Sequence, residues 1–353
     1  MIIDFDSCTV RFSGAGVLVA LTLMSTVGCN SPNGNNNKEV DMRAGRVLGA
    51  SSHVSAYPPP RDVPVDPALR TSAQRELEGD LQSNDQEVRA HALEALWKGG
   101  AAQPREILKA SDDPDPLVRY AACLAAGQMR LKNAHEKLLQ LVDDHDPTVR
   151  IVARYALHRI GDYRYSHDLE QLSRDPLPQV RGTTAMVLGM LGDPSAMKVL
   201  KPMRTDRHPA VRQQASAAMW QLGNQQGMDD LISWSISRYP DDRMMAFIGL
   251  AEPRNRSIIQ HVRNGLVSEY SQVALTAARA MGMLGSDEGY GVAEKGAKSV
   301  DPAERIQAAL TFGAIGRTDA QDVLKKLMSD SDTNVRIAAA EAILELKPEF
   351  VPG

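Results

Sequence analysis

Apolar residues recur along the chain with the spacing of an amphipathic helix, and the same helix returns about every 31 residues. A Val-Arg pair stands at residues 88–89, 118–119, 149–150, 180–181, 211–212 and 335–336, with gaps of 30 or a multiple of 31. Alanine occupies the place four residues after the Val position in eight of nine units. Offsets 0, 4, 7, 8 and 11 trace one face of an α-helix. The pattern predicts nine helical units in register.

Each unit carries signals for where its long helix begins and ends. Aspartate as an N-cap followed by proline at the first helical position is a start signal, because the carboxylate accepts from backbone N–H groups that have no partner. Glycines 31 residues apart suit a left-handed C-cap, and a shorter apolar segment follows each. Each unit is therefore predicted to be a long helix, a turn and a short helix. These signals are Pro116, Pro147, Pro178, Pro209, Pro240 and Pro302, with Asp115, Asp146 and Asp301 before three of them, and Gly161, Gly192, Gly223, Gly285 and Gly316 at the far end.

The unit is nearly whole in Asp146-Pro-Thr-Val-Arg150 with Ala153 and Gly161-Asp162, and it resembles the HEAT-like repeat of the phycobilisome-lyase type. The resemblance covers residues 70–349. It implies an all-α fold, a right-handed α-solenoid of about nine helix pairs with the Val-Arg helix on the concave side. The sixth unit departs from the pattern at Asp242 and ends in Glu252-Pro-Arg254, and the seventh has Ala274 in place of Arg. We expect a local change in curvature there.

The N-terminal residues read as a targeting segment. Residues 14–28 are apolar and uncharged, follow Arg11, and are too few to span a membrane as a helix. Thr26-Val27-Gly28-Cys29 resembles a bacterial lipobox, which implies lipidation of Cys29. A plain secretory signal or a short uncleaved anchor is the alternative. We expect residues 1–28 to be a signal peptide and residues 29–69, rich in Asn, Ser, Gly and Pro, to be a flexible tether.

Composition narrows the range of partners. The chain has 40 basic and 44 acidic side chains, so it lacks the basic field that nucleic-acid binding requires. Its three cysteines are too few for a disulfide framework. Cys8 and Cys29 flank the apolar segment, and Cys123 lies in an alanine-rich run where it is expected to be a buried apolar residue.

The arginine that follows the Val position forms a column through the repeats. It could form an anion-binding stripe, but acidic loop residues recur with the same period, so a structural ladder of Arg–Asp pairs is the favoured interpretation. The proposed members are Arg89, Arg119, Arg150, Arg181, Arg212, Arg243, Arg305 and Arg336, with Asp115, Asp146, Asp301 and Asp332 as loop partners.

Signals for catalysis are weak. His135-Glu136 resembles one His-Glu pair of the metal-dependent hydroxylases built from such repeats, which need several pairs, and no second pair is found. The eight histidines show no metal-ligand spacing. The sequence has no nucleophile elbow, P-loop or haem motif. No metal, cofactor or catalytic residue is expected.

Two surface features remain as candidates for binding a partner. The first is the stretch from His158 to His167, which includes Tyr163 and Tyr165 in a turn between helices. The second is the pair Trp97 and Trp220, which share a column nine residues after the Val position. Tyrosine and tryptophan are frequent at interface hot spots. For both features, simple packing is the competing interpretation.

Together these signals predict a lipid-anchored, non-catalytic scaffold in the bacterial cell envelope, on its periplasmic or extracellular face, that binds a protein or peptide. The alternatives are an enzyme of the chromophore-lyase or metal-dependent hydroxylase kind, and a glycan- or anion-binding envelope protein.

Overall fold

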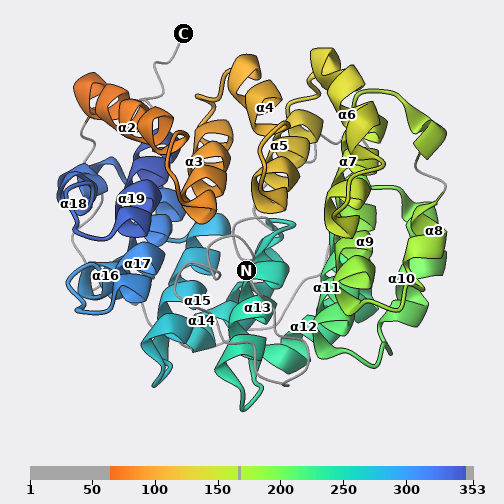
Figure 1. The fold of residues 1–353 in the computed structure, drawn as a ribbon. Coiled ribbons are helices and arrows are strands. Elements are labelled where there is room, and N and C mark those ends of the chain that lie inside the picture. Colours follow the sequence, from red (N-terminus) through yellow and green to blue (C-terminus); the bar gives the residue numbers. More distant parts are fainter. Residues whose placement is uncertain (1–63, 166–167, 347–353) are drawn as a thin grey trace, which may run out of the picture.

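The computed structural model describes residues 64–165 and 168–346, and within these ranges the fold is all helical. Eighteen α-helices form nine pairs, each an outer helix followed by an inner helix (Figure 1). The outer helices are α2 (Pro67–Asp80), α4 (Pro104–Ala110), α6 (His135–Leu141), α8 (Leu169–Leu172), α10 (Met197–Met203), α12 (Gln225–Ser235), α14 (Ile259–Arg263), α16 (Tyr290–Gly296) and α18 (Gln321–Leu327). The inner helices are α3 (Gln86–Lys98), α5 (Pro116–Gln128), α7 (Pro147–Arg159), α9 (Pro178–Leu191), α11 (Pro209–Gln221), α13 (Pro240–Ala251), α15 (Ser271–Met283), α17 (Pro302–Ile315) and α19 (Thr333–Glu345).

The inner helices begin where the sequence signals predict. All six prolines are the first residue of their helix. Asp115, Asp146 and Asp301 each accept a hydrogen bond from a backbone N–H two residues ahead, at 2.7 to 2.9 Å. The fold also includes the end of the segment predicted as a tether, because α2 begins at Pro67 and Val65 is buried.

The turns after the inner helices share one left-handed residue per repeat. The five predicted glycines all have positive φ. Where glycine is missing, arginine takes the same conformation, with φ of 51° at Arg130 and 55° at Arg254. A non-glycine residue there costs about 1 kcal/mol, so the repeat geometry imposes the turn even where the local sequence disfavours it.

The solenoid closes into a ring, which the sequence did not predict. The last inner helix, α19, packs against both α2 and α3 of the first pair (Figure 1). Polar contacts cross this junction, hereafter the seam. The Arg70 guanidinium donates to the Leu346 carbonyl at 2.8 Å, Arg336 Nε donates to Glu76 at 3.1 Å, and the His91 ring lies 3.2 Å from the Asn334 side-chain oxygen.

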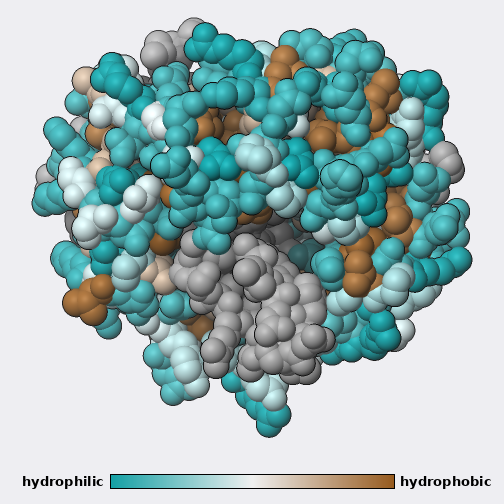
Figure 2. Space-filling model, in the orientation of Figure 1, coloured by the Kyte–Doolittle hydropathy of each residue, from teal (hydrophilic) through white to brown (hydrophobic). Residues whose placement is uncertain are grey.

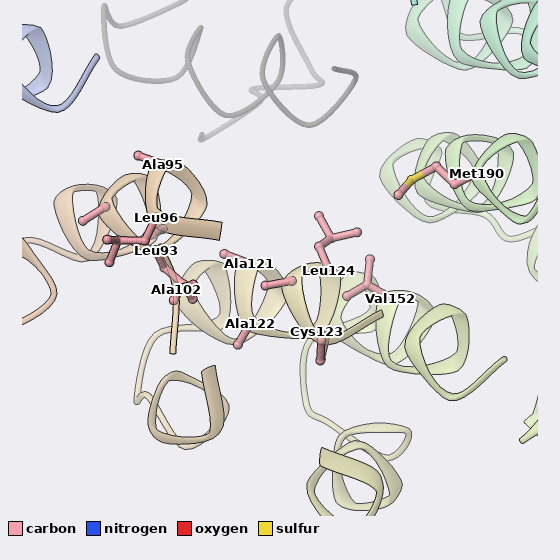
Figure 3. Packing of buried hydrophobic residues seen from close by; sticks show 14 of the residues in the cluster. Leu93, Ala95, Leu96, Ala102, Ala121, Ala122, Cys123, Leu124, Val152 and Met190 are labelled. Carbon is pink, nitrogen blue, oxygen red and sulfur yellow. The ribbon is translucent and has the colours of Figure 1, made fainter. Parts of the chain in front are cut away.

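The hydrophobic core follows the ring and runs through the seam. One cluster contains residues of the first pairs together with residues of the last, among them Leu96 and Leu344. A second cluster, from Ala217 to Leu284, begins in α11 of the fifth unit and lies mostly in the sixth and seventh units, which depart from the repeat pattern. Figure 3 shows the two faces of α5: Ala122 and Cys123 point to the outer helices, whereas Leu124 points the opposite way, the side on which Val152 of α7 also lies.

Small residues let neighbouring inner helices approach closely. A Cβ added to Gly282 of α15 would lie 2.7 Å from the backbone nitrogen of Ile315 in α17. A side chain at this position would therefore push the two helices apart. None of the helices in the described ranges is long and apolar enough to cross a membrane.

Candidate binding surfaces

The loops before the inner helices line one rim of the ring, and arginines tie them together. An arginine of one inner helix donates two hydrogen bonds to an aspartate in the next loop and further bonds to carbonyl oxygens of its own loop. Arg119, for example, contacts both carboxylate oxygens of Asp144 at 2.8 Å and the Asp113 carbonyl at 2.9 Å. The corresponding pairs are Arg89–Asp113, Arg181–Asp206 and Arg305–Asp330. The geometry is the bidentate form that fixes a carboxylate against a guanidinium.

The arginine column is therefore part of the scaffold, but its partners differ from those predicted. The predicted Asp115, Asp146, Asp301 and Asp332 cap helices. Where an aspartate binds the arginine, it lies two residues before the N-cap position, and in the loop of Asp301 that place is Ser299. The N-cap carboxylate is held over its own helix by backbone N–H groups. At the seam Arg336 reaches Glu76 instead. The hydrogen bond from Arg305 lowers the pKa of Asp330 below its usual value.

The ladder has a gap in the middle of the chain. The position of the arginine-binding aspartate is serine at Ser237 and Ser268. Among the residues that the structure describes, Arg212 and Arg243 accordingly form no ion pair, and Arg212 donates to carbonyl oxygens of its own loop. Arg150 also bonds only to carbonyls, at 2.8 and 3.2 Å.

The turn after α7 presents an aromatic surface, hereafter the tyrosine turn (residues 158–165). Tyr163 is 64% exposed and lies edge-to-face against His158, with ring centres 4.7 Å apart. Arg164 donates two hydrogen bonds to Asp162, at 2.9 and 2.6 Å, and its guanidinium lies 5.6 Å from the Tyr165 ring centre. The turn is thus held by its own contacts. Burial, followed by the charge of Arg159, lowers the pKa of His158, so its ring is neutral at pH 7.

The other predicted members of this surface are placed differently. Tyr165 is partly buried against the core, and His167 lies outside the described residues. Trp220 is only 6% exposed and its indole N–H donates to the Leu250 carbonyl at 3.0 Å. Trp97 is half-buried and packs against the core. The tryptophan column faces the next repeat, so Trp220 is removed from the candidate surface and Trp97 has little area to offer a partner.

Charged side chains converge on the inner wall at the seam. Lys98 of α3 lies 2.7 Å from Glu94 and 3.5 Å from Glu341 of α19, and all three side chains are buried. Burial is the main reason why the pKa of Glu94 rises to about 7, and Glu341 raises it further. Burial also raises the pKa of Glu345. Arg279 of α15 lies within electrostatic reach of Glu94, although two inner helices separate α15 from α3 around the ring.

These seam residues were not singled out from the sequence. Glu94 and Glu341 occupy the place six residues after the Val position, where other units have Leu124, Tyr155 and Met186. The sequence signal that could have identified them is an acidic side chain at a position that is apolar in most units.

His135 of the His135-Glu136 motif, which resembles a hydroxylase pair, contacts an aspartate of the tyrosine turn. The His135 ring lies 3.0 Å from Asp162 and 3.2 Å from Glu136. The hydrogen bond to Asp162 raises the pKa of His135, and the same contact helps to hold the tyrosine turn. Within the described ranges, the side chains of His, Cys, Asp and Glu form no group of three or more that could hold a metal ion.

The repeat family is established by comparison with known families. The family model for HEAT repeats matches residues 77–158, 166–243 and 292–349, more than half of the chain. The chain therefore belongs to the HEAT-repeat proteins. A sequence search among the curated proteins finds no match.

Solved structures with stacked helix pairs resemble this chain at low identity. The complex of CpcE and CpcF of phycocyanin lyase from Nostoc matches at 18% identity over 67% of this chain and 98% of its own, with a TM-score of 0.43. Human deoxyhypusine hydroxylase in complex with glycerol matches at 17% identity over 79% of this chain and 97% of its own, with a TM-score of 0.36. Neither similarity bears on what this chain binds.

Proposed function

We propose that this protein is a non-catalytic scaffold that binds a protein or an extended peptide, and that a lipid on Cys29 holds it in the bacterial cell envelope. The tyrosine turn is the observation that carries the binding role. Tyr163 offers a large exposed ring, and the contacts of Asp162 with Arg164 and His135 fix the turn before a partner arrives. An anchor that is already ordered loses little conformational entropy on binding.

The repeat architecture supports the same role. HEAT-like arrays present long continuous surfaces built from equivalent positions, and such surfaces commonly hold proteins and peptides. Ring closure adds rigidity, because each helix pair, including the first and the last, is held on both sides. The envelope location is supported by the apolar segment 14–28 and by the lipobox resemblance at Cys29, both of which lie outside the described residues.

The binding role is tested by capture from native membranes. The tagged chain is crosslinked and purified, and bound proteins are identified and quantified. Tyr163→Ala should reduce the recovered partner about tenfold, the effect expected for losing a hot-spot aromatic, while thermal unfolding stays unchanged because Tyr163 is exposed.

Leu177→Ala is the control, since it removes an exposed apolar side chain from a loop outside both proposed binding surfaces. Cys29→Ser separates location from binding, because it should release the chain from the membrane fraction without changing affinity for the isolated partner. Equal recovery by wild type and Tyr163→Ala would show that the tyrosine turn is not the binding surface.

A further inference from the structure

Two neighbouring rim loops are near copies of each other. Residues 236–239 read Ile-Ser-Arg-Tyr and residues 267–270, 31 positions later, read Val-Ser-Glu-Tyr. We call them the twin loops. They have the same conformation: the backbone N–H of each tyrosine donates to the hydroxyl of the serine two residues earlier, at 3.2 Å in both. Because α13 packs directly on α15, the loops lie next to each other on the rim (Figure 1).

The twin loops expose apolar side chains. Ile236 is 79% exposed and Val267 is 87% exposed, and Tyr239 and Tyr270 follow at 53% and 45%. The view in Figure 2 shows a described surface that is largely hydrophilic, with hydrophobic residues in small groups. Four large apolar side chains on two adjacent loops are therefore a concentrated patch, of the kind that marks an interaction site.

The gap in the arginine ladder coincides with these loops. Ser237 and Ser268 stand where four other loops carry the aspartate that binds arginine, and Ser83 and Ser299 hold the same place in two further loops. The same two units supply most of the separate hydrophobic cluster that begins at Ala217 of α11. The rim thus changes from a polar, internally paired surface to an apolar one over these two repeats.

The charges of the twin loops indicate what covers them. The residue before each tyrosine is Arg238 in the first loop and Glu269 in the second, and both side chains are exposed. Arg238 lies over its own Tyr239 ring, 4.7 Å from the ring centre, and no ion pair joins either residue to another part of the described chain. The patch therefore carries one positive and one negative charge at equivalent places, side by side.

We propose that the twin loops bind the twin loops of a second copy of this chain, across a two-fold axis that passes between them. The axis places Arg238 of each copy against Glu269 of the other, and it places the Ile236 loop on the Val267 loop. A two-fold contact needs a self-complementary patch. The twin loops form such a patch, because they carry one positive and one negative charge at equivalent places. The contact is small because each copy contributes only two short loops, whereas stable dimers bury about 1,200 Å² or more. The dimer is therefore weak, and its population depends on concentration.

Reversal of the two charges tests the pairing. Sedimentation velocity of the full chain in detergent should show a monomer–dimer equilibrium for the wild type. Arg238→Glu alone and Glu269→Arg alone should each raise the dimer dissociation constant by about tenfold or more, because the symmetry creates two like-charge contacts at once. Arg238→Glu with Glu269→Arg restores both pairs and should return the dissociation constant to within about threefold of the wild type.

Arg207→Glu is the matched control. It makes the same charge change at the same loop position one repeat earlier, outside the pairs that the axis creates, and should leave the dissociation constant unchanged. A wild type that stays monomeric at every concentration would overturn the proposal, as would a dimer that is insensitive to the single reversals. Single reversals that the double variant does not rescue would overturn the two-fold pairing. This inference does not depend on the tyrosine turn, so either proposal can fail alone.

Discussion

Lys98→Met is expected to destabilise the protein by about 3 kcal/mol at pH 8. Lys98 lies between Glu94 and Glu341 at the seam, and all three side chains are buried. Methionine matches the length of the lysine stem but removes its charge. The change leaves buried carboxylates without the cation that compensates them, which costs far more than the loss of a surface ion pair.

The loss should be smaller at pH 5. Burial already raises the pKa of Glu94 to about 7 and raises that of Glu345. Below pH 6 these carboxyls can take up protons when Lys98 is absent, so the uncompensated charge is relieved. Denaturant unfolding at the two pH values measures both effects.

Lys137→Met provides the control. Lys137 pairs with Asp112 at 2.6 Å, but its side chain is partly exposed to water. The same substitution there should cost less than about 1 kcal/mol. Equal losses for the two variants, or a loss at Lys98 that does not depend on pH, would contradict the buried cluster at the seam.

The second large effect concerns Glu252, the buried C-cap residue that follows α13. Its pKa rises to about 8 because burial disfavours the charged carboxylate, and the hydrogen bond from Gln221 offsets this only in part. An unfolded glutamate has its ordinary value of 4.5. Between these two values the unfolded chain ionises while the folded chain keeps its proton. The contribution of Glu252 to stability therefore falls as pH rises from about 4.5 to about 8.

Glu252→Gln should remove this part of the pH dependence. At pH 8.5 the variant should be more stable than the wild type by at least about 2 kcal/mol, and at pH 4.5 the two should differ little. Glu269→Gln makes the same change on an exposed glutamate and should not alter the pH profile. Parallel profiles for wild type and Glu252→Gln would show that Glu252 is ionised in the folded protein.

The local structure of each repeat could be predicted from the sequence because its signals are local. Proline at the first helical position and aspartate before it fix the start of a helix, and glycine fixes its end. Arg130 and Arg254 show the limit of this reasoning. They adopt the left-handed conformation because the repeat geometry requires it, although their side chains disfavour it.

Ring closure could not be predicted in this way. Closure requires each of nine units to turn by about 40° with no net rise along the axis. Small differences in the packing angles between helices decide whether the ring closes. The residues that lock the seam occupy ordinary positions of the repeat, so the period alone does not distinguish them. The same holds for the ladder. The periodic presence of both charges indicated pairing, but which aspartate binds the arginine depends on the loop conformation.

The candidate binding surfaces were predicted in part. Tyr163 is exposed in a turn, as its place between helices indicated. Trp220 was a candidate because of its residue type and because it shares a column with Trp97, and the packing against α13 buries it. The twin loops were missed, although aligning the units in register places Tyr239 above Tyr270 and Ile236 above Val267. Apolar residues at loop positions were the signal that could have identified them.

The most direct test of the fold is a crosslink across the seam. In a chain whose three native cysteines are replaced by serine or alanine, Glu76→Cys and Arg336→Cys are introduced at a seam contact that water reaches, and the chain is treated with a short bis-maleimide under native conditions. The closed ring, in which the native side chains at these positions lie 3.1 Å apart, predicts that most of the chains form an intramolecular link, seen as a changed mobility after denaturation. Single-cysteine variants and urea-unfolded protein should show none. Two freely reactive, unlinked thiols in the folded protein would show that the solenoid is open.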